Sequence, residues 1–258
     1  MAVPFGLKLL GAGALVGAAI WHAWPYLDVA RAQAKLKVYG PKTMADRLAQ
    51  FGPAVDARLA PHFERAGVPY PPATVVLAGY KRERVLDVFA AGEDGNLAWV
   101  RRYPILAASG GPGPKLRQGD YQVPEGLYRI ELLNPNSKFH LSLRVNYPNA
   151  ADRRRAEAEG RTKLGGDIMI HGKALSAGCL AMGDPAAEDL FILAARTGHE
   201  NLEVILAPSD IARATADPAQ LQRVTPWYPE RWTAIQQRLR ALPPAPPMLT
   251  GPRAAATP

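Results

Sequence analysis

One stretch of the chain carries most of its structural and functional information, and it reads Asp167-Ile168-Met169-Ile170-His171-Gly172-Lys173-Ala174-Leu175-Ser176-Ala177-Gly178-Cys179-Leu180-Ala181-Met182. The apolar run at 168–170 predicts a short buried strand, which Gly172 ends directly after His171. Gly178 precedes Cys179, the only cysteine in the sequence, and allows a tight turn that points backbone N–H groups outward. The histidine and the cysteine are therefore candidates for a base and a nucleophile.

The same two residues also allow a purely structural interpretation. A single cysteine is often a small buried apolar residue, and a lone histidine often has a satisfied place in the core or on the surface. Chemistry separates the two cases, because the thiolate is the reactive form of cysteine and a neighbouring imidazolium lowers the thiol pKa towards neutrality. Cys179 and His171 taken alone leave both catalysis and packing open.

The surrounding residues resemble the active-site signature of the L,D-transpeptidase family of the YkuD type. His171-Gly172 followed by Ser176-Ala177-Gly178-Cys179 is similar to the family's Ile-His-Gly segment and its later Ser/Thr-His-Gly-Cys segment. Lys115 precedes a second segment that resembles the family's, Gly119-Asp120-Tyr121-Gln122-Val123-Pro124-Glu125-Gly126-Leu127-Tyr128-Arg129-Ile130. Together the matches extend over about residues 73–207, and two separated motifs in the right order are more specific than either one.

Two departures from the family pattern resemble its YafK-like branch of murein L,D-transpeptidases. Ala177 stands where the family usually has a histidine, and the gap between His171 and Cys179 is shorter than in most members. The branch also has segments like Phe139-His140-Leu141-Ser142 and Asn146-Tyr147-Pro148-Asn149. Because this branch includes an enzyme that cleaves links to peptidoglycan, the resemblance leaves the direction of the reaction open.

The resemblance implies a role for each site residue. Cys179 is the nucleophile, and His171 keeps its thiolate formed and then protonates the leaving amine. A backbone carbonyl is expected to orient the second ring nitrogen of His171. The N–H groups of Gly178 and Cys179 are the natural oxyanion hole. The candidate substrate-binding residues are His140, Ser176, Gly172 and Arg161. A solvated basic loop explains Arg161 and Lys163 equally well.

The implied substrate is the tetrapeptide stem of peptidoglycan, attacked at the carbonyl of its diamino acid with D-Ala as the leaving group. An amine acceptor would give a cross-link or attach a wall-bound lipoprotein, whereas water would give hydrolysis or detach such a protein. The resemblance implies no metal and no organic cofactor. A different class of function stays open, in which the chain is an inactive, envelope-anchored peptidoglycan-binding module with a structural cysteine.

Composition bounds these interpretations. The 258 residues, 48% hydrophobic and 21% charged, are typical of a globular protein. One cysteine excludes an intramolecular disulfide and any zinc site that needs two thiolates. The formal net charge of +8 predicts a solvated basic surface, or one that sits near anionic lipid or wall polymer. Because no nucleic-acid motif is present, we expect no nucleic-acid partner.

Residues 1–27 are expected to be a signal peptide or a membrane anchor. Their apolar core follows Lys8 and ends in a cluster of aromatic residues before Asp28. Extended to Leu27, the segment is just long enough to span a bilayer. We therefore expect an exported protein in the periplasm or cell envelope, anchored in the inner membrane if the segment is retained.

The rest of the chain is predicted to form four segments. They are a helical segment with a linker at 28–72, a mainly β catalytic domain of sandwich or barrel type at 73–207, C-terminal helices at 208–242, and a disordered Pro/Ala-rich tail at 243–258. Thr43 is expected to cap a helix that a Gly52-Pro53 break separates from a second one at 55–66. A strand is predicted at 121–123, and Asp184 is predicted to cap a further helix.

Overall fold

The structure is a computed structural model that describes residues 27, 30, 34 and 40–248. Apart from Leu27, the predicted signal peptide or anchor at 1–27 lies outside the described residues. Within the part of the chain that is described, no helix is long and apolar enough to cross a membrane.

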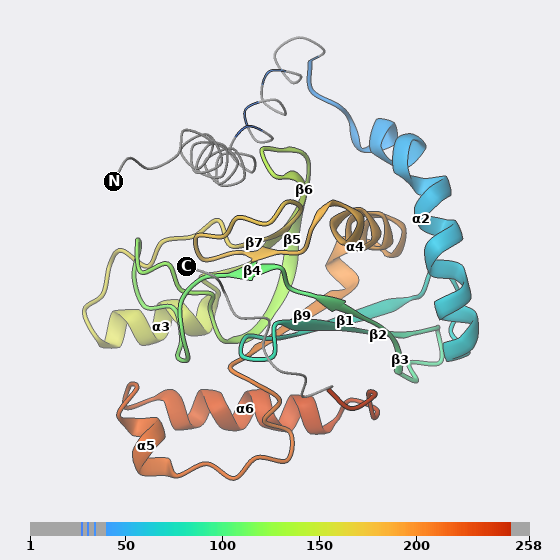
Figure 1. The fold of residues 1–258 in the computed structure, drawn as a ribbon. Coiled ribbons are helices and arrows are strands. Elements are labelled where there is room, and N and C mark those ends of the chain that lie inside the picture. Colours follow the sequence, from blue (N-terminus) through green and yellow to red (C-terminus); the bar gives the residue numbers. More distant parts are fainter. Residues whose placement is uncertain (1–26, 28–29, 31–33, 35–39, 249–258) are drawn as a thin grey trace, which may run out of the picture.

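A twisted and curved mixed sheet forms the body of the protein (Figure 1). Its strand order is β3-β2-β1-β9-β5-β6-β7-β8-β4. The β1–β9 and β7–β8 pairs are parallel and the other pairs antiparallel. The strands are β1 Thr74–Tyr80, β2 Val85–Ala91, β3 Ala98–Pro104, β4 Ala107–Ala108, β5 Gly126–Ser137, β6 His140–Val145, β7 Met169–His171, β8 Leu180–Ala181 and β9 Leu202–Ala207.

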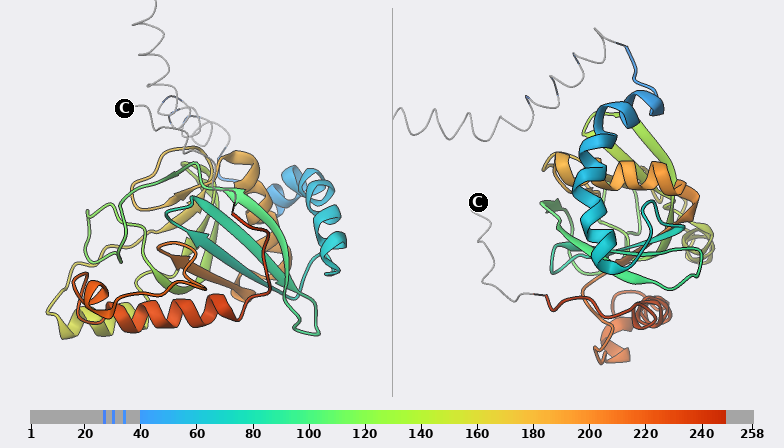
Figure 2. Two further views of the ribbon diagram at one scale, coloured as in Figure 1. Left: turned by 60° about the horizontal axis from the view of Figure 1, so that its bottom comes forward. Right: turned by 90° about the vertical axis from the view of Figure 1, so that its right-hand side faces the viewer.

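The central strands are apolar on both faces because helices cover both sides of the sheet. On one side, α2 (Met44–Ala66) and α4 (Asp184–Thr197) pack on the larger core, to which Phe63 and Leu190 contribute. On the other side, α6 (Tyr228–Arg240) supplies Ile235 to a second core. The views in Figure 2 show α6 and α2 on opposite sides of the strands.

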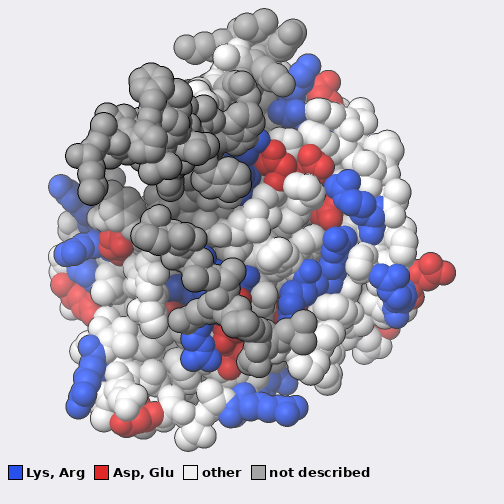
Figure 3. Space-filling view, viewed as in Figure 1, with Lys and Arg blue, Asp and Glu red and all other residues white. Residues whose placement is uncertain are grey.

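The remaining helices are short. They are α3 (Ala150–Ala158), η1 (His199–Asn201) and α5 (Pro218–Gln222). The expected strand-rich body with flanking helices is therefore confirmed in outline, but its strands form one nine-stranded mixed sheet rather than two stacked sheets. In Figure 3, Lys and Arg are spread over the visible face and interspersed with Asp and Glu.

The predicted break at Gly52-Pro53 is wrong, because α2 runs unbroken from Met44 to Ala66. Thr43 does cap this helix, in a capping box with Asp46. An internal proline costs a helix about 3 kcal/mol. Tertiary contacts offset this cost, because α2 buries an apolar stripe against α4 and is joined to it by an ion pair from Arg58 to Asp189.

Two further local predictions are also wrong. Residues 121–123 form no strand, since Tyr121 has φ of 53° and the Asp120 carboxylate accepts the Gln122 N–H at 3.1 Å in a turn. Asp184 is the first residue of α4 rather than its cap, because its carboxylate binds Lys173. The disordered tail at 243–258 stays a prediction; Met248 packs on the second core, and residues 249–258 lie outside the description.

Candidate active site

Cys179 lies directly before β8, at the point where this strand begins to run parallel to β7. The register pairs Ile170 with Leu180, so the cysteine is placed level with Met169. The Met169 N–H donates to Cys179 Sγ at 3.4 Å, and the thiol lies 3.6 Å from the Asp167 carbonyl oxygen. The residue is half-buried, and this burial raises the pKa of the Cys179 thiol above its ordinary value.

His171 ends β7 and is buried, with 2% of its surface exposed. Its Nδ1 lies 2.6 Å from the Gly172 carbonyl oxygen. Because a carbonyl oxygen can only accept a hydrogen bond, Nδ1 carries the ring proton and donates it. The Phe139 ring packs on the imidazole at a centroid distance of 4.7 Å. The expected backbone acceptor for the second ring nitrogen is therefore present, and Nε2 is left for proton transfer.

The histidine and the cysteine lie close together at the β7–β8 pair. His171 is two residues beyond Met169, about 6.6 Å along a strand. No hydrogen bond joins the Cys179 thiol to the His171 ring within residues 40–248. Burial lowers the pKa of His171 and raises that of the Cys179 thiol, so both shifts favour the neutral pair over the ion pair.

Two serine hydroxyls accept hydrogen bonds from the backbone amides that were predicted to form the oxyanion hole. Gly178 donates its N–H to Ser109 Oγ at 2.6 Å, and Cys179 donates its N–H to Ser176 Oγ at 3.2 Å. Gly178 has φ of 102°, and a Cβ there would lie 3.3 Å from the Gln122 carbonyl oxygen. The turn before the cysteine therefore needs glycine, while its two amides already have partners.

Ser109 was not anticipated from the sequence. Apart from its place before a glycine-rich loop, no local signal marks it, and it is 69 residues away from the amide that it binds. Lys115, which was quoted only as part of the motif, is buried and donates to Asp120 at 2.5 Å. The Asp120 carboxylate also accepts hydrogen bonds from the N–H groups of Leu116 and Arg117. The Lys115–Asp120 ion pair thus holds the loop at 115–120 in one conformation.

Gly172 has a close-packed position in the site. A Cβ added to it would lie 2.6 Å from Asp184 Oδ1 and 2.8 Å from the Phe139 carbonyl oxygen. The same residue supplies the carbonyl that holds His171. Gly172 therefore supports the imidazole of His171, and its contact with substrate stays a prediction.

The other predicted substrate-binding residues are engaged elsewhere in this structure. His140 Nε2 lies 2.9 Å from Glu188 of α4, and its ring packs on Phe51 of α2. Arg161 pairs with Glu159 and donates to the Leu116 carbonyl at 2.8 Å. Lys163 is exposed. None of these side chains forms a hydrogen bond or ion pair with Cys179, and their roles towards substrate remain predictions.

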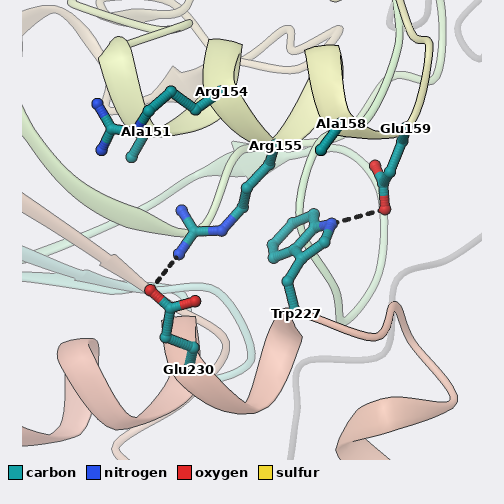
Figure 4. A pocket seen from close by; sticks show the side chains of 7 residues that line it. All are labelled: Ala151, Arg154, Arg155, Ala158, Glu159, Trp227 and Glu230. Atoms are coloured by element: carbon teal, nitrogen blue, oxygen red, sulfur yellow. Dashed lines mark hydrogen bonds and ion pairs between the residues drawn. The ribbon is translucent and has the colours of Figure 1, made fainter.

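A separate hollow of about 270 Å³ lies between α3 and the start of α6. Figure 4 shows Arg155 reaching Glu230 and the Trp227 indole N–H reaching Glu159 across it. None of the predicted site residues lines this hollow, which is bordered by α3, by Glu159 and by Trp227 and Glu230 at the start of α6. Among the described residues, no group of three or more His, Cys, Asp or Glu side chains is placed to hold a metal ion.

Comparison with known proteins decides the family. The model of the YkuD L,D-transpeptidase catalytic domain matches residues 75–204, about half of the chain. The chain belongs to the L,D-transpeptidase family. YafK of Escherichia coli is 38% identical over 115 residues, which make up 43% of this chain and 44% of that relative. The match thus spans less than half the length of this curated relative.

Solved structures give weaker likenesses. The helical cell shape determining protein Pgp2 of Campylobacter jejuni is 22% identical with a TM-score of 0.44, over 57% of this chain and 51% of that chain. Bd1075 of Bdellovibrio bacteriovorus is 19% identical with a TM-score of 0.40, over 67% of this chain and 56% of that chain.

Proposed function

We propose that this chain is a cysteine-dependent L,D-transpeptidase that acts on peptidoglycan stem peptides through a thioester acyl-enzyme. One observation supports this function above the others. Within the family domain, the half-buried Cys179 thiol lies beside β7, whose last residue is a buried histidine held by one ring nitrogen. The other ring nitrogen has no hydrogen-bond partner among residues 40–248, so it is available as a base.

In the proposed reaction, His171 Nε2 takes the thiol proton while Cys179 Sγ forms a bond to the carbonyl carbon of the diamino acid. The tetrahedral intermediate then collapses, the C–N bond breaks, and the imidazolium returns its proton to the departing amine of D-Ala. A thioester on Cys179 and free D-Ala result. Because burial disfavours both the thiolate and the imidazolium, we expect proton transfer to accompany the attack rather than to precede it.

The acyl-enzyme is resolved by an acceptor in the second step. An amine from a neighbouring stem gives a cross-link, and an amine of a wall-bound lipoprotein gives its attachment. Attack by water gives a tripeptide and makes the protein a hydrolase of the same bonds, including those that hold attached protein. The catalytic steps at Cys179 and His171 are the same for each acceptor.

Mass spectrometry of the products tests the proposal. The chain from residue 28 onward is incubated with purified tetrapeptide muropeptides, beside Cys179→Ala and Cys179→Ser variants. Serine keeps the size of the side chain and removes the thiol, so it separates nucleophilicity from packing. D-Ala loss with a cross-linked dimer supports a transpeptidase, and D-Ala loss with tripeptide alone supports the hydrolase.

A negative result in that assay leads to a defined second substrate, which is peptidoglycan with attached protein. Cysteine-dependent release of protein would support a detaching enzyme. If wild type and Cys179→Ala act equally or not at all on both substrates, the enzyme proposal is refuted and the binding module replaces it.

We also propose that the chain is exported to the periplasm or cell envelope. The apolar segment before Asp28 is the feature that supports this placement. Fractionation of cells that express the whole chain, with and without residues 1–27, measures it. Recovery of both forms from the cytosol would contradict export.

A further inference from the structure

The backbone N–H groups of Gly178 and Cys179 raise a question about how the oxyanion would be stabilised. Each N–H already donates to a serine hydroxyl, one to Ser109 and one to Ser176. The two hydroxyl oxygens are 3.5 Å apart. Both amide hydrogens are therefore already engaged by hydroxyl oxygens.

The two hydroxyls differ in where their own protons point. Ser176 donates to the Cys179 carbonyl at 2.6 Å and accepts a second N–H, from Ser109, at 3.3 Å. The Ser176 hydroxyl is therefore engaged in hydrogen bonds of the turn that precedes the cysteine. Ser109 instead donates to the Tyr121 carbonyl at 2.8 Å, on a residue that is 63% exposed and has a positive φ of 53°.

Sheet register places Ser109 next to the nucleophile. The antiparallel β4–β8 pair joins Ala107 to Ala181 and Ala108 to Leu180. One further step in this register brings Ser109 level with Cys179. The hydroxyl is half-buried in this position, and its attachment to the end of a strand fixes its distance from the cysteine backbone.

We propose that the Ser109 hydroxyl is an oxyanion donor in the acyl transfer, an inference that rests on the proposed function of Cys179. As Sγ attacks, the Ser109 O–H turns from the Tyr121 carbonyl to the substrate carbonyl oxygen. Gly178 continues to donate its N–H to Ser109 Oγ, so the developing negative charge is shared along two hydrogen bonds in series. The proton stays on Ser109, and no covalent bond of the serine changes.

Removing the hydroxyl should slow acylation without preventing it. Loss of one oxyanion donor costs roughly 100- to 1,000-fold in rate in well-studied hydrolases. In Ser109→Ala the Gly178 N–H loses its partner and can donate directly to the oxyanion. This partial replacement reduces the expected loss to roughly 10- to 100-fold.

Two small electrophiles distinguish an oxyanion donor from a residue that merely holds the turn. p-Nitrophenyl acetate reacts at a carbonyl carbon and passes through an oxyanion, and the release of p-nitrophenolate reports acylation. Iodoacetamide reacts at its methylene carbon by displacement of iodide, so no oxyanion forms. Both reagents require the same thiol, and neither requires that peptidoglycan be the substrate.

The experiment measures both rates in the whole chain for wild type, Ser109→Ala and Ser109→Thr. Thr233→Ala is the matched control, because that hydroxyl donates to a backbone carbonyl within α6, away from the cysteine. We expect Ser109→Ala to lose 10- to 100-fold in acylation while its alkylation rate stays within about twofold. Threonine, which keeps the hydroxyl, should retain most of the acylation rate.

The outcomes separate this inference from the proposed function. Equal loss of acylation and alkylation in Ser109→Ala would show that the serine only positions the turn, and would overturn the inference. It is equally overturned if acylation is unchanged, if threonine is as slow as alanine, or if the ester does not acylate wild type. Ester acylation with the expected split, together with failure on every muropeptide, would retain the donor and refute only the proposed substrate.

Discussion

Replacing Glu125 with glutamine should destabilise the fold strongly, although the residue lies outside the catalytic pair. Its carboxylate is fully buried and accepts from Lys81 Nζ at 2.9 Å and from the Gly113 N–H at 2.9 Å. Tyr228 of α6 donates its hydroxyl to the other carboxylate oxygen. Glu125 thus joins the end of β1, the glycine-rich loop and the C-terminal helix.

The expected loss in the free energy of unfolding depends on which hydrogen bonds the Lys81 ammonium keeps after the substitution. Breaking a buried ion pair by neutralising one partner costs about 3–5 kcal/mol. The side chain of Lys81 is only 10% exposed, and burial lowers its pKa while Glu125 opposes that shift. The ammonium keeps hydrogen bonds to the carbonyls of Gly113 and Val123. These remaining acceptors put the expected loss at the lower end, about 3 kcal/mol.

Urea denaturation followed by circular dichroism measures this loss as a change in midpoint at constant slope. Glu230→Gln is the matched control, since Glu230 pairs with Arg155 at 3.1 Å but is 78% exposed. An exposed pair of this kind contributes about 0–1 kcal/mol. The double variant with Lys81→Met should be less destabilised than the sum of the two single variants, because no charge is then left buried.

The reasoning is refuted if Glu125→Gln costs no more than Glu230→Gln, or if the two substitutions at positions 81 and 125 are additive. Either result would mean that water or a rearranged loop solvates the ammonium. The contact network around Glu125 would then contribute far less to stability than its burial implies.

Two further predictions concern the site. Because burial raises the pKa of the Cys179 thiol, its alkylation by iodoacetamide should rise about tenfold from pH 7 to pH 8, and a plateau below pH 8 would contradict this. Gly172→Ala should cost about 1–3 kcal/mol in urea denaturation and up to about 100-fold in D-Ala release, because the clash with Asp184 moves the carbonyl that holds His171. Gly111→Ala is its control, since a Cβ there meets nothing within 4 Å; equal losses in the two variants would argue against the clash.

Much of the local structure could be predicted from the sequence, since its causes lie within a few residues. The Thr43 cap and the short strand before Gly172 both follow from neighbouring side chains. The motif around His171 and Cys179 indicated the family, which the family match confirmed. The carbonyl that holds the imidazole was also anticipated, although not that it would belong to Gly172.

Other features depend on contacts that local spacing does not encode. The helix through Gly52-Pro53 persists because α4 packs along it. A propensity-based interpretation places a break there, since it omits the free energy gained from burial against distant elements.

The sequence by itself determined which residues could do the chemistry, a lone thiol after a glycine and a histidine at the end of an apolar run. Only the tertiary structure decided how they are arranged. Parallel pairing of β7 with β8 put Cys179 level with Met169, and antiparallel pairing of β4 with β8 brought Ser109 to the Gly178 amide. Strand register is set by the packing of whole sheet faces, so hydrogen bonds between residues 69 positions apart emerge only when the sheet is assembled.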